Sequence, residues 1–68
     1  MSNLNNIIGN NVRTKREQQN MTGEELAKKS GVSTSMIYYI ESGRKKPSVL
    51  TLIALADSLL CTVDDLVH

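Results

Sequence analysis

The side chains that could bind a ligand are mainly cations, and all of them precede Pro47. Residues 1–46 contain all eight Lys and Arg residues against four Glu, a balance of +4, whereas residues 47–68 contain three Asp and no Lys or Arg, a balance of −3. Lys and Arg side chains neutralise phosphates, so this division favours a polyanionic partner for one face of the molecule. Solvated helix surfaces are the alternative interpretation, and it is favoured for Arg13, Lys15, Lys28 and Lys29.

Residues suited to catalysis or metal binding do not form a recognisable set. The chain has one His and one Cys, His68 and Cys61, and both lie near its end, where we expect Cys61 to pack as a small apolar residue. The carboxylates of Glu24, Glu25, Asp64 and Asp65 occur at expected helix starts, where capping explains them. There is neither a Gly-rich phosphate loop nor a metal-ligand spacing. We therefore expect no enzyme, metal, cofactor or small-molecule ligand.

Length and composition favour one small helical domain spanning residues 1–68. A chain of 68 residues can bury one modest core, and with two Tyr as its only aromatic residues that core must be aliphatic, which suits packed helices. The sequence has no secretory signal and no run of about 18 apolar residues. A single Cys permits no intramolecular disulfide. The expected location is the cytoplasm, without contact with a membrane.

Helical spacing of apolar residues and capping signals predict an all-α bundle of about five short helices. Asn20 closes the first helix, Thr22 and Glu25 form a capping box before the second, and Thr62 and Asp65 have a similar form near the end. The expected helices cover residues 4–19, 23–30, 33–41 and 50–60, followed by a last turn after residue 62.

Residues 23–42 fit a helix-turn-helix, the unit in which a second helix can enter the major groove of DNA. Ala27 must be small where the helices cross, and Gly31 must turn with a positive φ angle. Apolar side chains must hold the crossing angle, and they are present at Leu26, Val32, Ile37 and Ile40. The third helix then presents its polar side outward.

Beyond these steric requirements, the chain resembles the lambda-repressor/Cro-like helix-turn-helix family along nearly its whole length. The matching residues are Gly23-Glu24-Glu25-Leu26-Ala27, Gly31-Val32-Ser33, Ile37, Ile40-Glu41-Ser42-Gly43, Pro47-Ser48, Leu52 and Ala56. The resemblance implies a transcription regulator, typically a repressor, that binds a palindromic double-stranded DNA operator as a homodimer. A protein-interaction module, such as an antitoxin with an autoregulatory helix-turn-helix, is the alternative.

The resemblance also implies site residues. Base contacts are expected at Thr34, Ser35, Tyr38, Tyr39 and Arg44, and phosphate contacts at Thr22, Gly23, Ser42, Lys45 and Lys46. At Gly23 the chain departs from the family, which often has a phosphate-contacting Gln there, so only the backbone amide remains. The third helix lacks Arg, Asn and Gln, the residues that pair with bases through two hydrogen bonds, and its direct readout should be permissive. For Tyr38 and Tyr39, packing with the hydroxyl in water is the alternative.

Two further features follow from the same resemblance. Arg16 and Glu41 are expected to form a partly buried ion pair with two hydrogen bonds. Leu60, Val63 and Val67 are expected to contribute to a two-fold dimer interface, the alternative being that they cover the small core of a monomer.

Overall fold

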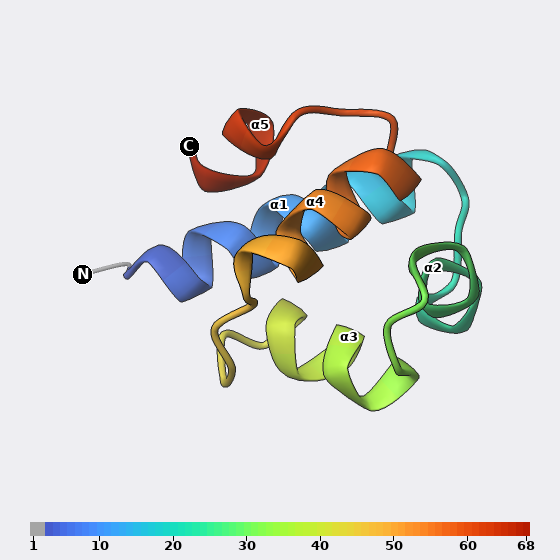
Figure 1. Ribbon diagram of the computed structural model, residues 1–68, viewed down its shortest axis with the longest axis horizontal. Coiled ribbons are helices and arrows are strands. Elements are labelled where there is room, and N and C mark those ends of the chain that lie inside the picture. The colour runs from blue at the N-terminus through green and yellow to red at the C-terminus, as the bar shows by residue number, and fades with distance from the viewer. Residues whose placement is uncertain (1–2) are drawn as a thin grey trace.

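The computed structural model describes residues 3–68, which form five α-helices and no strand (Figure 1). The helices are α1 (Leu4–Gln18), α2 (Gly23–Ser30), α3 (Thr34–Glu41), α4 (Val49–Ser58) and α5 (Val63–Val67). Helix α1 packs against α3 and α5, while α2 packs against α3 and α4. The expected all-α bundle is confirmed. Within residues 3–68, none of the helices has the length and apolar character needed to cross a membrane.

Reciprocal hydrogen bonds start two of the helices. At α2 the Glu25 amide donates to the Thr22 hydroxyl (3.1 Å) and the Thr22 amide donates to the Glu25 carboxylate (2.9 Å). Thr62 and Asp65 form the same arrangement at α5, with distances of 3.1 and 3.0 Å. Both predicted capping boxes are confirmed. In each capping box the pKa of the carboxyl is lowered below its ordinary value by hydrogen bonds from the capping Thr. The backbone amide of the Thr has the larger effect and its side chain the smaller one.

The core is aliphatic and draws on all five helices. Leu26, Ile37 and Ile40 are buried as predicted, whereas Val32 and Met36 are half-buried at the margin of the core. Burying a side chain of this size stabilises the fold by about 1.5–3 kcal/mol. The largest fully buried side chains are Val12, Leu26, Ile37, Ile40, Leu55, Leu59 and Leu66.

A close crossing of α1 and α3 depends on Gly9. A Cβ atom at Gly9 would overlap the carbonyl oxygen of Ile40 and lie 2.8 Å from that of Glu41. Glycine inside a helix costs about 1 kcal/mol relative to alanine, so its presence in α1 needs a compensating reason. The crossing supplies that reason, because it sets the end of α3 directly against α1.

Helix α4 ends earlier than the predicted range of 50–60. Its C-cap is Leu59, and Leu60 takes a left-handed conformation with a φ angle of 56°. The amides of Leu60 and Cys61 then donate back to the carbonyls of Asp57 (3.3 Å) and Ala56 (2.9 Å). Asn20 after α1 and Gly43 after α3 also have positive φ angles, but those residue types tolerate the conformation better than leucine does.

Candidate nucleic-acid interface

Helices α2 and α3 form the predicted helix-turn-helix. Helix α2 ends at Gly31, whose φ angle is 71°, and the Ser33 hydroxyl caps α3 by accepting the Met36 amide (3.1 Å). Because Ile37 and Ile40 point into the core, the opposite side of α3 faces outward. Ser35, Tyr38 and Tyr39 are exposed on that side, and Thr34 is half-buried at its start.

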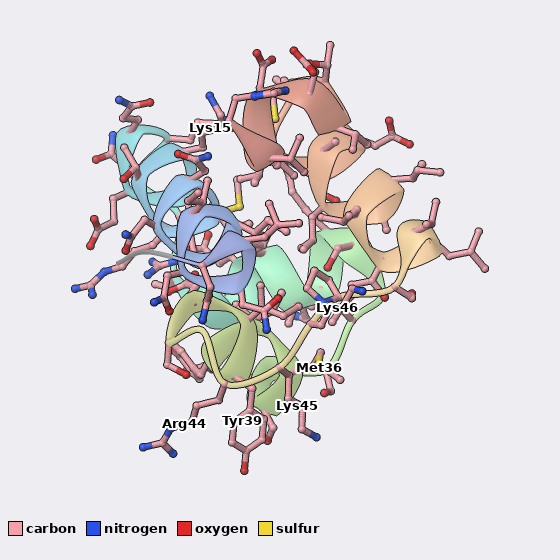
Figure 2. The ribbon with its side chains drawn as sticks, turned by 90° about the vertical axis from the view of Figure 1, so that its left-hand side faces the viewer. Lys15, Met36, Tyr39, Arg44, Lys45 and Lys46 are labelled. Atoms are coloured by element: carbon pink, nitrogen blue, oxygen red, sulfur yellow. The ribbon has the colours of Figure 1, made fainter. Side chains whose placement is uncertain are left out.

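The loop after α3 places cations beside this outward side. In Figure 2, Tyr39, Arg44 and Lys45 point in the same direction, from the lower edge of the molecule. The ammonium of Lys45 lies 4.8 Å from the centre of the Tyr39 ring, within the range of a cation–π interaction. Lys46 lies farther along the loop toward α4, and Lys15 lies at the opposite end of the view. The structure thus brings together Tyr39, Arg44 and Lys45, and sets Lys46 apart from them.

Two hydroxyl-bearing residues that are expected to contact phosphates lie at helix ends, one at the start of α2 and one at the end of α3. Thr22 stands at the start of α2, where its hydroxyl oxygen accepts a hydrogen bond from the Glu25 amide and its own amide donates to the Glu25 carboxylate. Ser42 ends α3, and its hydroxyl donates to the carbonyl of Tyr39 (3.1 Å). Both residues are exposed.

Tyr38 and Gly23, which were expected to contact DNA separately, contact each other. Gly23 is buried, and a Cβ atom built on it would lie 2.7 Å from both the Cζ and the hydroxyl oxygen of Tyr38. The Tyr38 ring therefore covers the first residue of α2, although half of the side chain remains exposed. Sequence reasoning missed this contact, because it depends on how closely α2 and α3 pack.

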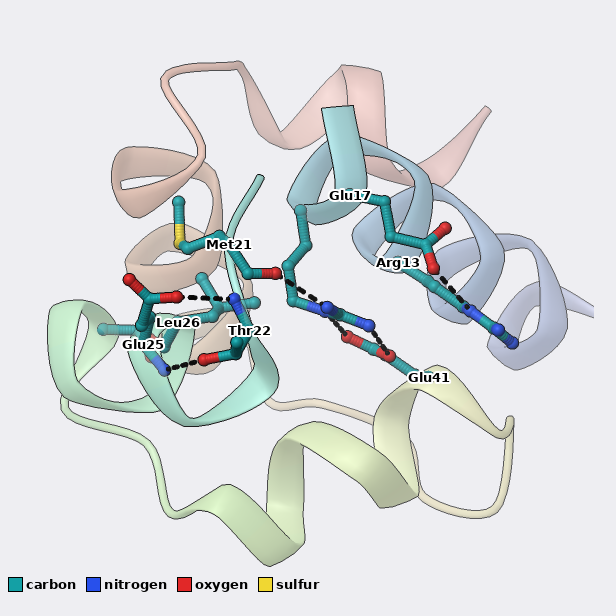
Figure 3. Close-up of polar contacts among 9 residues, drawn as sticks. Arg13, Glu17, Met21, Thr22, Glu25, Leu26 and Glu41 are labelled. Carbon is teal, nitrogen blue, oxygen red and sulfur yellow. Dashed lines mark hydrogen bonds and ion pairs between the residues drawn. The ribbon is translucent and has the colours of Figure 1, made fainter. Parts of the chain in front are cut away.

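Arg16 of α1 contacts both the end of α3, at Glu41, and the loop before α2, at Met21, two residues that Figure 3 labels. Its Nε and Nη2 atoms donate to the two carboxylate oxygens of Glu41 at 2.7 and 3.0 Å, and its Nη1 donates to the carbonyl of Met21 at 2.8 Å. The side chains of Arg16 and Glu41 are only 13% and 7% exposed. The hydrogen bond to Glu41 raises the pKa of Arg16, against the opposing effect of burial. The expected ion pair is present. Sequence reasoning missed the hydrogen bond from Arg16 to the Met21 carbonyl, which connects the loop before α2 to this ion pair.

The residues expected at a dimer interface differ in exposure. Leu60 is 85% exposed, whereas Val63 and Val67 are half-buried against the core. More apolar surface is exposed on α4 instead, at Val49 (70%), Leu50 (80%) and Ile53 (43%). These positions are spaced i, i+1 and i+4, so they share one side of α4. The structure therefore does not gather Leu60, Val63 and Val67 into one exposed patch.

Comparisons with known proteins agree with this geometry. The profile of the helix-turn-helix family matches residues 12–66. The HTH-type transcriptional regulator y4dJ of Sinorhizobium fredii is 36% identical over 53 residues, which cover 78% of this chain and 69% of that protein. The clp gene regulator ClgR of Corynebacterium glutamicum has 31% identity and a TM-score of 0.91 over 96% of this chain and 69% of its own. The DNA-binding domain of the P22 c2 repressor has 30% identity and a TM-score of 0.84, over 87% of this chain and 78% of its own.

Proposed function

Because this chain belongs to the helix-turn-helix family of DNA-binding transcription regulators, we propose that it represses transcription by occupying a palindromic operator as a homodimer. In this proposal α3 enters the major groove, and the bound dimer excludes RNA polymerase from the promoter. The observation that carries the binding of DNA by α3 is the shared direction of Tyr39, Arg44 and Lys45 beside the outward side of this helix (Figure 2).

The proposed contacts divide by chemistry. Thr34, Ser35 and Tyr39 offer single hydrogen bonds to base edges, and Arg44 is the one long side chain beside α3 that can make two. Phosphate contacts come from Thr22, Ser42, Lys45 and Lys46. With so few strong base contacts, part of the specificity must come from DNA shape and ordered water.

Salt dependence tests the phosphate contacts. If each subunit neutralises about four phosphates, the slope of log Kd against log salt for the dimer should have a magnitude of about 7. Lys45→Ala should reduce that slope, whereas Lys15→Ala, the matched control at the opposite end of the molecule, should not. An affinity that barely responds to salt would refute the proposed contacts.

The proposed homodimer is supported by the geometry of a two-part operator. One α3 reads few base pairs, and two subunits on half-sites about 34 Å apart extend the reading. Leu60 supports this part of the proposal. In the isolated chain its left-handed backbone conformation is strained, and its apolar side chain is 85% exposed to water. We propose that Leu60 and the exposed side of α4 meet a second copy, with Val63 and Val67 at the margin. Sedimentation that gives a 7.5 kDa species at every concentration, with and without DNA, would rule this out.

Selection of bound DNA from a random pool, followed by two substitutions, tests the roles. Tyr39→Ala should change the preferred bases, and Lys45→Ala should weaken binding to all sequences alike. Because the Lys45 ammonium rests over the Tyr39 ring, Tyr39→Ala should also cause part of the uniform loss. If Lys45→Ala changes base preference and Tyr39→Ala does not, the assignment of roles is wrong.

A further inference from the structure

Tyr38 lies against the first residue of α2 rather than among the base-reading side chains. We infer that its phenol hydroxyl donates a hydrogen bond to a DNA backbone phosphate, in place of the side chain that Gly23 lacks. This inference rests on the proposed binding of α3 in the major groove. It assigns Tyr38 to positioning the protein on the duplex and removes it from the base-reading set.

The contact between Tyr38 and Gly23 means that a side chain at position 23 would have to displace the end of the Tyr38 ring. A Cβ atom at position 23 would lie 2.7 Å from both the Cζ and the hydroxyl oxygen of Tyr38, closer than carbon and oxygen atoms pack. The end of the phenol therefore occupies the space in which a side chain at position 23 would begin. Gly23 itself is buried under the ring, so the hydroxyl rather than the Gly23 amide is presented at the surface.

The Tyr38 hydroxyl is available to donate a hydrogen bond to a phosphate. Side-chain hydrogen bonds around α3 within residues 3–68 use Ser33, Ser42 and Glu41, and leave the Tyr38 hydroxyl available as a donor. The first turn of α2 carries Glu24 and Glu25 and no cation, so its carboxylates repel a phosphate and a contact there depends on neutral donors such as the Tyr38 hydroxyl. A phenol held by packing has few torsions to immobilise on binding, which makes it an effective donor.

The first test compares Tyr38→Phe with Tyr39→Phe, which removes the same hydroxyl from the neighbouring position. Fluorescence anisotropy would measure Kd for the selected operator and for an unrelated duplex of equal length. Tyr38→Phe should raise both values by the same factor, about 3- to 10-fold per bound subunit, as expected for one lost hydrogen bond. Its base preferences in the random pool should match the wild type. Tyr39→Phe should instead change the ratio between the two duplexes.

The second test uses the steric conflict at Gly23. Gly23→Ala should displace the Tyr38 ring and raise both Kd values about as much as Tyr38→Phe does. In a Tyr38→Ala background, where the ring is absent, Gly23→Ala should have little further effect. Circular dichroism melting of each variant confirms that the compared proteins are folded, and Tyr38→Phe retains the ring for any case in which Gly23→Ala does not fold.

Three outcomes separate the possible failures. If the wild-type protein enriches no sequence and binds no duplex, the proposed function itself is wrong. If the wild type binds and Tyr38→Phe binds both duplexes equally well, Tyr38 only packs against α2 and the inference alone is overturned. If Tyr38→Phe alters preference at particular base pairs but leaves affinity for the unrelated duplex unchanged, Tyr38 reads bases, which also overturns it.

Discussion

Removing the Arg16 side chain should strongly destabilise the protein. Arg16→Ala would leave the Glu41 carboxylate, only 7% exposed, without the two hydrogen bonds of 2.7 and 3.0 Å that now neutralise it. The Met21 carbonyl would lose its 2.8 Å bond as well. An uncompensated buried charge costs about 3–5 kcal/mol. In a domain of this size each kcal/mol lowers Tm by about 4–8 °C, so we expect a fall of at least about 12 °C.

Urea denaturation and thermal melting, both followed by circular dichroism, would measure the loss. Arg13→Ala is the matched control, because Arg13 also pairs with a glutamate, Glu17 at 3.5 Å, but with side chains 61% and 57% exposed. An exposed pair contributes about 0–1 kcal/mol, so the control should stay close to wild type. An Arg16→Met, Glu41→Leu double variant should regain much of the stability, because it leaves no buried charge. If Arg16→Ala melts within error of wild type, the reasoning about this pair is wrong.

Three further predictions concern the helices that support the interface. Gly9→Ala should cost about 1–3 kcal/mol by thermal melting, because its Cβ atom would overlap backbone oxygens of α3; a gain from helix propensity alone would contradict the close crossing. Leu60→Gly should raise the Tm of the monomer, since it relieves about 1 kcal/mol of left-handed strain, yet weaken dimerisation in sedimentation; equal association would exclude Leu60 from the interface. Hydrogen bonds from Thr22 lower the pKa of Glu25 below its ordinary value of 4.5. The capping box is therefore complete above pH 4.5, and its contribution to stability is lost as the pH falls through the lower pKa of the folded state. Thr22→Ala removes the side-chain hydrogen bond but keeps the larger contribution from the backbone amide, so NMR titration should show the pKa of Glu25 returning only part of the way toward its ordinary value. An unchanged pKa would exclude the side-chain contribution.

Much of the local structure could be predicted from the sequence. The capping box of Thr22 and Glu25 joins residues three positions apart, and Gly31 ends α2 with a φ angle of 71° that glycine adopts freely. These features depend on neighbours in the chain and need no knowledge of how the helices pack. The helix-turn-helix was therefore predictable, as were the outward positions of Tyr38 and Tyr39.

Other features needed more than local pattern. Arg16 and Glu41 are 25 positions apart, and only the resemblance to a family suggested that they pair. Sequence predicts the end of α4 too late, because Leu59 and Leu60 suit a helix by propensity. In the structure, the turn at Leu60 lets Leu59 stay buried while Cys61 returns to the core.

By itself, the sequence determined where helices begin and turn, which side of each is apolar, and which residues of α3 face outward, because those properties arise within a few residues of chain. Tertiary structure alone decided how closely separate elements approach and which of their residues touch. The Tyr38 ring contacts Gly23, and the carbonyls at the end of α3 lie close to Gly9. Both contacts require the crossing angles and the helix separations that the shared core imposes. Such contacts depend on the packing of every core side chain at once, and no local pattern records them.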